Sequence, residues 1–474
     1  MLPAAERDQW VVFEENREAV VAALRRGECD AILPAAHTFL DDFAEFLHGH
    51  QILDQFGGFP DPRARGSIPA FFFCVTLLYL PLFRLHHLAD IEGVLFRSPF
   101  ILRLLGFNAR QIAQGFYTST GPHPFTAEAL GDFFAAVSPE TLIEQQLALL
   151  GHLHRRFPAV FRHGVYAMDC TTVAAPPGRL GLPAARFVIC ILSVHLGSAA
   201  VPILWSYAPE TGEGTGDISL GRQLMARARE VLTPQDLALL LIDRGFLDGA
   251  WLAEQAGLGT DIIIGLTEDM HAYADLVGLS RLLDTVWEDV PPPKNHRDPP
   301  PRRQVALFPQ IESWDACTIP LTGLVVRDCY PSGEIVYQAY VSPRAFPDGA
   351  SFYREQRRRW DAEECYMALA RYWNVNDLPP LRLGVAQALV HFALVAYLLL
   401  SLFRWHTQAE GPLASLPRAL IPEVELAVYA GNTFALLTAS EILTIVLNHA
   451  PTWRRNRAKI LAALRLSERR LDSS

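Results

Sequence analysis

The stretch LALLLIDRGF, residues 237–246, holds six apolar residues in a row, followed by Asp243, Arg244 and Gly245. A short, wholly apolar run is typical of a strand that is buried on both faces of a sheet. An acid directly after such a strand is held by the sheet, while the end of the strand stays open to a substrate. The stretch therefore predicts a buried strand with a candidate site residue, Asp243, at its end.

The sequence on either side of this run predicts further strands. A helix that begins at Asp217 or Ser219 and continues to residue 232 precedes the run, and the dipeptide Gly197-Ser198 separates two longer strand candidates. Hairpin-like strands followed by a strand–helix alternation predict an α/β fold with a mixed sheet covered by helices. The expected strands are 165–168, which ends at Asp169, then 187–196, 199–208, 237–242 and 261–266.

The chain has 474 residues, which is enough for two or three domains. A proline- and charge-rich segment at 291–303 and two strand candidates, 323–329 and 334–341, predict a β-rich insertion. Helical patterns follow at 350–373, at 383–403 and near 432–447. The expected division is a helical N-terminal domain with a candidate role in DNA binding (1–155), the first half of a catalytic domain (156–268), the insertion (269–345), the second half (346–450) and a basic tail (451–474).

The composition is that of a globular protein, with 50% hydrophobic and 19% charged residues. A formal net charge of −10 argues mildly against a nucleic-acid-binding protein, although a large chain can confine its basic surface to one groove. Nearly all cationic side chains are arginines, which is best explained by a GC-rich coding source and also suits bidentate phosphate contacts.

The cysteines and the apolar runs bear on the compartment. The seven cysteines are scattered without a C-x-x-C pair, which indicates free thiols in a reducing cytoplasm. The start of the chain shows no signal-peptide pattern. Residues 383–403 are long enough to cross a membrane, but they include Gln387, His391 and Ser401. We therefore expect a buried helix of a soluble protein and no membrane partner.

Three acidic residues stand out by their context: Asp169 and Asp243 after predicted strands, and Glu363 in the helical stretch RWDAEE, residues 359–364. Carboxylate oxygens are hard ligands that suit Mg²⁺ or Mn²⁺. Two such ions can activate a water or a 3′-hydroxyl group and stabilise the leaving oxygen, which is what phosphodiester chemistry requires. The three acids are therefore candidate catalytic residues and ligands of two metal ions.

Each feature also has a plain structural interpretation. An isolated Asp after a strand usually forms a turn or a helix cap, and an Arg–Glu pair four residues apart is usually a surface ion pair. The basic stretch beside Glu363 is either a solvated helix face or a set of phosphate contacts. The candidate DNA-binding residues are Arg354, Arg357, Arg358, Arg359 and Arg371.

The order and context of the three acids resemble the DDE transposases of bacterial insertion sequences, in particular the insertion-sequence-four family. In that family the first acid precedes small hydroxyl residues, as in MDCTT (168–172). The second lies in a strand-Asp-Arg-Gly-aromatic run, as in LIDRGF (241–246), and the third in an Arg-Trp-x-x-Glu helix, as in RWDAE (359–363). The resemblance covers residues 163–400.

This resemblance implies a ribonuclease-H-like catalytic domain that is interrupted by a β-rich insertion before the glutamate. It also implies binding of the element ends in double-stranded DNA, cleavage at the 3′ ends and strand transfer into target DNA. A homodimer that pairs two ends and a bacterial cytoplasmic, nucleoid-associated location are further implications.

The sequence departs from the family signature at two positions. Where the family has a Tyr three residues before the Arg and a Lys seven residues after the Glu, this chain has Gln356 and Ala370. If Glu364 were the acid, Arg371 would fall at the lysine position, but Trp360 would then replace the arginine. We keep Glu363. Two alternatives of the same fold stay open: an end-binding DNA protein without catalysis and a metal-dependent nuclease that cleaves without joining.

Overall fold

The chain forms two compact units, one made of Met1–Gln145 with Arg382–Ser474 and the other of Gln146–Leu381. Helix α9 (Pro139–Arg156) contains the first boundary between them. The computed structural model describes residues 12–34, 38–63, 68–83, 85, 87–94, 102–103, 105–118, 121–123, 125–178, 183–197, 199–210, 216–292, 300–373, 375, 378–408 and 425–449. The basic tail predicted at 451–474 lies outside these residues.

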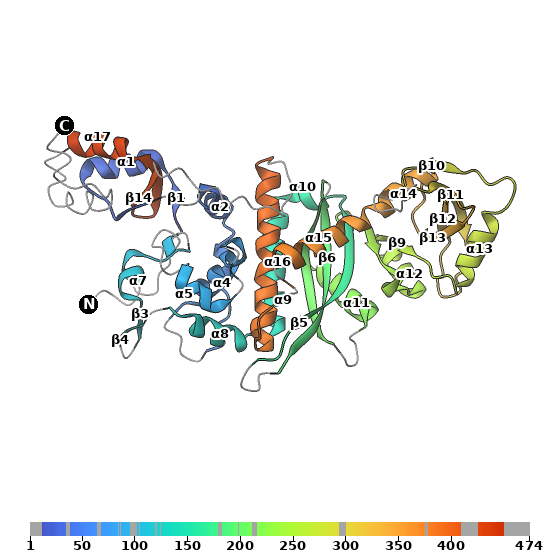
Figure 1. The fold of residues 1–474 in the computed structure, drawn as a ribbon, viewed down its shortest axis with the longest axis horizontal. Helices are drawn as coiled ribbons and strands as arrows, with labels where there is room; N and C mark the ends of the chain where they lie inside the picture. The colour runs from blue at the N-terminus through green and yellow to red at the C-terminus, as the bar shows by residue number, and fades with distance from the viewer. Residues whose placement is uncertain are drawn as a thin grey trace. The chain divides into compact units, whose positions relative to one another are not determined.

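The unit Gln146–Leu381 is built on a nine-stranded mixed sheet (Figure 1). Its first five strands have the order β7-β6-β5-β8-β9. Strand β6 pairs antiparallel with both β5 and β7, whereas β8 pairs parallel with both β5 and β9. These strands are β5 (Val165–Ala175), β6 (Ala185–Leu196), β7 (Ala199–Pro209), β8 (Leu239–Ile242) and β9 (Asp261–Gly265).

The apolar run that opened the sequence analysis forms β8, and all four of its residues are buried. Its place between two parallel neighbours explains the lack of polar alternation, because both faces of the strand are covered. The α/β class and the mixed sheet that were expected are therefore present in the structure. Strand β5 differs from the prediction, since it continues past Asp169 to Ala175. The extension is stabilised by pairing with β6 as far as Ala185.

The remaining four strands continue the same sheet in the order β10-β11-β12-β13, and β13 joins β9 through antiparallel pairing. Sequence analysis expected two strands in this insertion, and the structure adds two more. They are β10 (Glu288–Val290), β11 (Arg302–Ile311), β12 (Leu321–Cys329) and β13 (Ile335–Ser342). A buried ion pair between Arg303 and Asp328 joins β11 to β12, with 2.6 Å between Nε and Oδ1.

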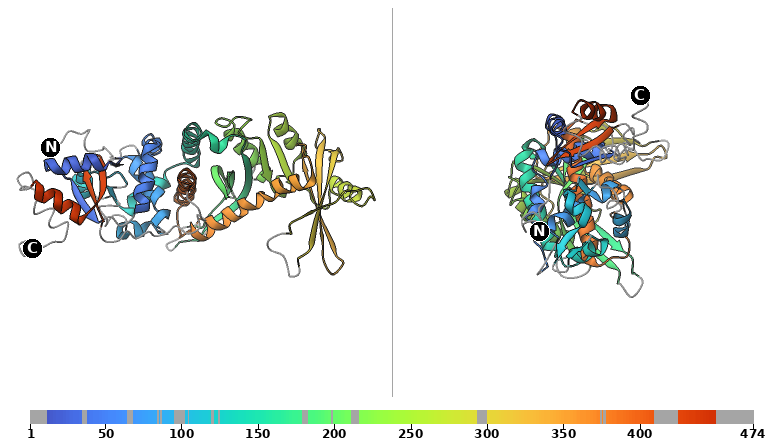
Figure 2. Two further views of the ribbon diagram at one scale, coloured as in Figure 1. Left: turned by 90° about the horizontal axis from the view of Figure 1, so that it is seen from above. Right: turned by 90° about the vertical axis from the view of Figure 1, so that its left-hand side faces the viewer.

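Helices cover both faces of the sheet (Figure 2). Helix α11 contacts β5, β6 and β7, and α12 contacts β9. Helix α15 contacts β5 and β7, whereas α14 contacts the insertion strands β10, β11 and β12. The helices of this unit are α10 (Pro158–Phe161), α11 (Asp217–Ala228), η4 (Arg244–Phe246), α12 (Gly249–Gly257), α13 (His271–Leu279), α14 (Gly349–Arg357) and α15 (Arg359–Tyr372).

In the other unit, the apolar helix α16 (Leu383–His406) contacts α2, α4 and α8. It is long and apolar enough to cross a membrane, and it is the one such helix in the described part of the chain. Its residues from Val385 to Phe403 are all buried within the protein, as expected for a core helix. The division of the chain differs here from the predicted one, which placed 383–450 in the catalytic domain.

Four short strands, in the order β1-β15-β14-β2, bring segments from 14–34 and from 425–438 into one small sheet. The segment near 432–447, expected as one helix, forms β15 and then α17, because β15 pairs along its length with β14. The elements of this unit are β1 (Glu14–Glu15), α1 (Arg17–Arg26), β2 (Ala31–Pro34), α2 (Thr38–Gly49), α3 (Asp54–Gly57), α4 (Ala70–Tyr79), η2 (Pro81–Phe83), α5 (Leu88–Val94), α7 (Ala109–Gln114), β3 (Phe116–Thr118), β4 (Gly121–His123), α8 (Ala127–Ala135), β14 (Glu425–Ala430), β15 (Thr433–Thr438) and α17 (Ala439–Asn448).

Candidate functional site

Asp169 lies within β5 and pairs with Ile191 of β6. Because side chains alternate along a strand, Asp169 and the preceding Met168 point to opposite faces of the sheet. Met168 faces α11, since a Cβ added to Gly221 of that helix would come within 2.9 Å of its methyl group. Asp169 is thus directed to the other face. There its carboxylate is half-buried and also accepts a hydrogen bond from the backbone N–H of Cys170 at 2.9 Å.

The surroundings of Asp169 raise its pKa to about 6. Burial is the largest cause, and the negative charge of Asp243 is the second. Glu363 raises the pKa further, whereas the Cys170 N–H and the Arg359 guanidinium lower it. Asp243 lies at the end of a strand, and Glu363 and Arg359 lie on a helix, yet all three act on the carboxyl group of Asp169. The structure therefore brings the three predicted acids and Arg359 close together.

Asp243 follows β8 and caps the short helix η4, accepting a hydrogen bond from the Gly245 N–H at 2.6 Å. Gly245 leaves space for two carboxylates. A Cβ at this position would lie 2.5 Å from Oδ2 of Asp217 and 3.0 Å from Oδ1 of Asp243. Asp217, the first residue of α11, therefore adds a fourth acid beside Asp243. Sequence analysis treated Asp217 only as a helix start, and the spacing gave no signal of its position beside Gly245.

Glu363 lies one helical turn into α15. Its carboxylate forms an ion pair with Arg359, with 2.6 Å between Nη2 and Oε1. Both side chains are partly exposed, at 26% for Arg359 and 30% for Glu363. Glu364 is exposed to solvent, whereas Glu363 is partly buried and is among the charges that raise the pKa of Asp169. Of the two neighbouring glutamates, the structure places Glu363 toward the other acids.

A pocket of about 230 Å³ opens beside Asp243. Charged and neutral hydrogen-bonding residues share its lining with the apolar residues Leu241, Ile242 and Ile263, so the pocket has mixed polarity. Tyr340 on its wall donates a hydrogen bond to Gln338 at 3.0 Å. The pocket is lined by Leu241, Ile242, Asp243, Arg244, Ile263, Gly265, Gln338, Tyr340, Gln356 and Arg359. Gln356, which departs from the family signature, and Arg244, which sequence analysis did not select, thus belong to the site.

The other predicted DNA-binding arginines have varied environments. Arg354 is exposed on α14. Arg357 lies beside the ring of Tyr353, and its Nη1 is 3.4 Å from the tyrosine hydroxyl group. Arg358 forms an ion pair with Glu355 at 3.2 Å. Arg371 belongs to α15, but its side chain lies outside the described residues.

The donor chemistry of the three acids suits a hard divalent cation, but their arrangement is not that of a preformed metal site. Among the described residues, no group of three or more His, Cys, Asp or Glu side chains is placed to hold a metal ion. The ion pair with Arg359 explains part of this arrangement, because the guanidinium balances charge that a cation would otherwise balance. Glu363 would have to exchange Arg359 for the metal.

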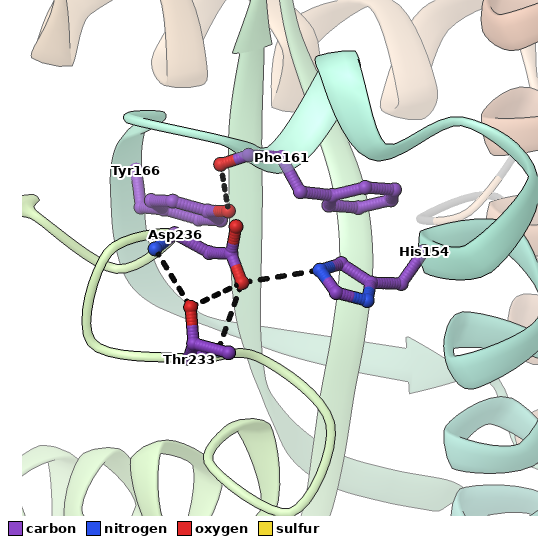
Figure 3. Close-up of polar contacts among 5 residues, drawn as sticks. All are labelled: His154, Phe161, Tyr166, Thr233 and Asp236. Atoms are coloured by element: carbon purple, nitrogen blue, oxygen red, sulfur yellow. Dashed lines mark hydrogen bonds and ion pairs between the residues drawn. The ribbon is translucent and has the colours of Figure 1, made fainter.

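A different polar cluster lies at the other end of β8, around the buried Asp236 (Figure 3). Oδ2 of Asp236 accepts hydrogen bonds from the backbone N–H and hydroxyl group of Thr233, at 2.9 and 2.7 Å. The same oxygen lies 3.1 Å from Nε2 of His154, and Tyr166 donates to the carbonyl of Phe161 at 3.1 Å. The polar groups of this cluster are therefore hydrogen-bonded within the protein. The cluster links the end of α9 to the sheet and has a structural role.

A search of protein-family models finds none that matches this chain, and a search of the curated proteins finds no relative.

Proposed function

We propose that the chain is a DNA transposase, with a ribonuclease-H-like catalytic unit that cleaves and rejoins phosphodiester bonds at the ends of an insertion sequence. One observation carries the proposal. Asp169, Asp243 and Glu363 are about 74 and 120 residues apart in the chain, yet the negative charges of Asp243 and Glu363 both act on the carboxyl group of Asp169. A half-buried acid whose pKa is raised by burial and by neighbouring acids, as that of Asp169 is, is typical of a functional site.

The position of the insertion supports the same proposal. Strands β10 to β13 lie between β9 and α15, so they interrupt the unit before the helix that carries Glu363. This is where the resemblance places a β-rich insertion in the transposase family. The proposal includes double-stranded DNA as substrate and a homodimer as the species that pairs two DNA ends.

We propose that Asp169, Asp243 and Glu363 hold Mg²⁺ or Mn²⁺. When bound, two such ions would activate the attacking hydroxyl group or water and stabilise the leaving oxygen. The protein's own groups prepare the site: β5 and the end of β8 hold two of the carboxylates on rigid backbone, and α15 presents the third. Arg359 neutralises Glu363 until a cation replaces it, and its guanidinium then becomes available to a phosphate of the DNA.

The test is a cleavage assay on a plasmid that carries the coding sequence with its native flanking DNA, in Mg²⁺ or Mn²⁺. We expect wild-type protein to cut at the flanks and each of Asp169→Asn, Asp243→Asn and Glu363→Gln to lose cutting. Each substitution keeps the shape of the side chain but removes the charge that a metal ligand needs.

Gel-shift binding to the same flanking DNA separates catalysis from binding. The three variants should still bind, since the affinity of such proteins for DNA comes mainly from arginine–phosphate contacts. Wild-type protein that binds the flanks but never cuts with either metal would favour an end-binding protein without catalysis. Cutting without any joined product would favour a nuclease, and cutting by the carboxylate variants would place the active site elsewhere.

A further inference from the structure

His195 is a fully buried side chain on β6, and the proposed chemistry does not use it. It follows Val194, which pairs with Tyr166 near the start of β5. Residues 191, 193 and 195 lie on one face of β6, because side chains alternate along a strand. Ile191 pairs with Asp169 of β5, so the two share that face. His195 therefore points to the same face of the sheet as Asp169, the face on which α15 lies.

Both ring nitrogens of His195 lie at hydrogen-bond distance from backbone carbonyl groups. Nδ1 is 2.9 Å from the carbonyl oxygen of Val165, at the start of β5, and Nε2 is 2.8 Å from that of Arg358. A carbonyl oxygen only accepts, so both contacts are full hydrogen bonds only when both nitrogens carry a proton. Nearby charges are the carboxylate of Asp361, 3.7 Å from Nε2, and the guanidinium of Arg358.

Arg358 is the residue at which α14 ends and α15 begins. Its carbonyl oxygen accepts a hydrogen bond from the N–H of Asp361 at 3.0 Å as well as the contact from His195. A side chain that binds a carbonyl of the helical ladder is a recognised way to interrupt a helix. The contact from His195 lies at the residue where α14 ends and α15 begins.

The two helices on either side of this break are attached to different parts of the sheet. Helix α14 is fastened to the insertion, because Glu288 of β10 accepts hydrogen bonds from the Gly349 and Ala350 N–H groups, at 2.9 and 3.2 Å. Helix α15 is fastened to the main strands, because Tyr366 donates to the Ile191 carbonyl at 3.4 Å. Glu363 lies in the first turns of α15, directly after the break.

We infer that His195 is a positioning residue: by holding the Arg358 carbonyl through Nε2, it sets the start of α15 and thereby the place of Glu363 and Arg359 relative to Asp169. The inference rests on the proposed function for its catalytic consequence, but its structural consequence can be measured separately. A misplacement of a catalytic group by about 1 Å can lower a rate by about 100-fold.

Two substitutions separate the two nitrogens. In His195→Gln the amide nitrogen lies near the position of Nε2, so the bond to Arg358 is kept and the bond to Val165 is lost. In His195→Asn the amide nitrogen lies near the position of Nδ1, so the bond to Val165 is kept and the bond to Arg358 is lost. Each variant keeps one of the two ring contacts and loses the other, so a purely structural role would affect both by similar amounts. His154→Asn, which removes the contact between His154 and Asp236, serves as the control.

The structural readout is the distance between spin labels at positions 354 on α14 and 367 on α15, introduced on unnatural amino acids because the chain holds seven cysteines. We expect the distance distribution to shift or broaden in His195→Asn and to stay as in wild type in His195→Gln and His154→Asn. The functional readout is single-turnover cleavage of the flanking DNA at saturating protein, which should fall about 10- to 100-fold in His195→Asn only.

If His195→Asn and His195→Gln behave alike in the label distance, the inference is overturned. If the label distance changes as expected but wild-type protein does not cut DNA, the proposed function fails and the positioning role stands. If the distance changes as expected and cleavage of both variants equals that of wild type, the break does not govern Glu363, and the positioning role is also overturned.

Discussion

The two ends of β8 hold acidic side chains in opposite circumstances. Before the strand, burial alone would raise the pKa of Asp236, but the hydrogen bonds of Thr233 and the nearby His154 lower it below its usual value. Beyond the strand, Asp243 helps to raise the pKa of Asp169, which has other acids close by and few donors. A satisfied carboxylate stabilises a fold, whereas carboxylates held together with too few partners are available for a ligand.

Exchanging one acid at each end of β8 for its amide should separate the role in stability from the role in catalysis. The loss of cleavage in Asp243→Asn is the largest effect that we expect. Asp243→Asn should lower DNA cleavage by more than about 100-fold, because loss of even an outer partner of a metal site costs about 10- to 100-fold. Its free energy of unfolding should stay within about 0.5 kcal/mol of wild type. Asp236→Asn should lower the free energy of unfolding by about 1–3 kcal/mol, because donors of Thr233 lose a charged acceptor.

Chemical denaturation and the cleavage assay, run on the same preparations, measure both quantities. A large loss of stability in Asp243→Asn, together with normal stability in Asp236→Asn, would reverse the roles assigned to the two ends.

Gly245 offers a second way to disturb the acidic end alone. In Gly245→Ala the new methyl group would meet carboxylate oxygens of Asp217 and Asp243 at 2.5 and 3.0 Å, so one of them must move. We expect cleavage to fall about 10- to 100-fold. Gly265→Ala is the matched control in the same pocket, since its methyl group would lie 3.4 Å from Arg244 and Tyr340. Equal cleavage by the two variants would show that the spacing of the carboxylates around Gly245 is unimportant.

In metal-free buffer, the contributions of Asp169 and Asp236 to the free energy of unfolding should change with pH in opposite directions. Asp169 has a folded-state pKa of about 6, above the value of about 3.9 in an unfolded chain. Its contribution to stability is therefore present below about pH 4 and is lost as the pH rises through 6. Asp169→Asn should become more stable relative to wild type across this interval.

Asp236 has a lowered pKa, so its contribution is present above the unfolded value of about 3.9 and is lost as the pH falls through its folded-state pKa. The stability difference between wild type and Asp236→Asn should thus shrink only in acid. Denaturation curves of the three proteins between pH 3 and pH 8 test this, and differences that run in the same direction for both residues would contradict it.

The smallest expected effect concerns the arginines of α14. Among the residues that the structure describes, Arg354 forms no ion pair, whereas Arg358 is paired with Glu355. Each lost phosphate contact lowers the slope of log affinity against log salt by about 0.9. We expect this change for Arg354→Ala and little change for Arg358→Ala. Gel-shift titrations at several salt concentrations measure the slopes, and an unchanged slope for Arg354→Ala would remove that residue from the DNA-binding surface.

Much of the sheet could be predicted from the sequence because its central strands are marked by apolar runs. Strand β8 was found from residues 237–242, and β9 from 261–266. The end of β5 was missed, because Cys170, Thr171 and Thr172 carry no hydrophobic alternation and are held in a strand by pairing with β6. Strands β1 and β2 pair with β15 and β14, which are distant in sequence, and a local pattern does not reveal such pairing.

The candidate site was predictable only in part for a similar reason. Asp169, Asp243 and Glu363 each stand in a recognisable local context. Asp217 and His195 owe their places to the packing of α11 and α15 on the sheet, and nothing in their neighbouring residues indicates it. The ion pair between Arg359 and Glu363 was anticipated as the structural interpretation of that spacing, and the structure contains it beside the acids.

The most direct test of the central claim is the binding of Mn²⁺ to the purified protein, followed by the electron paramagnetic resonance signal of free Mn²⁺. The account predicts that wild-type protein binds Mn²⁺ and that Asp169→Asn and Glu363→Gln weaken binding by at least about tenfold. It also predicts that Arg359→Ala tightens binding, because the cation no longer competes with the guanidinium for Glu363. Binding that is absent in wild type, or that is unchanged in both carboxylate variants, would contradict the assignment of these acids as a metal site.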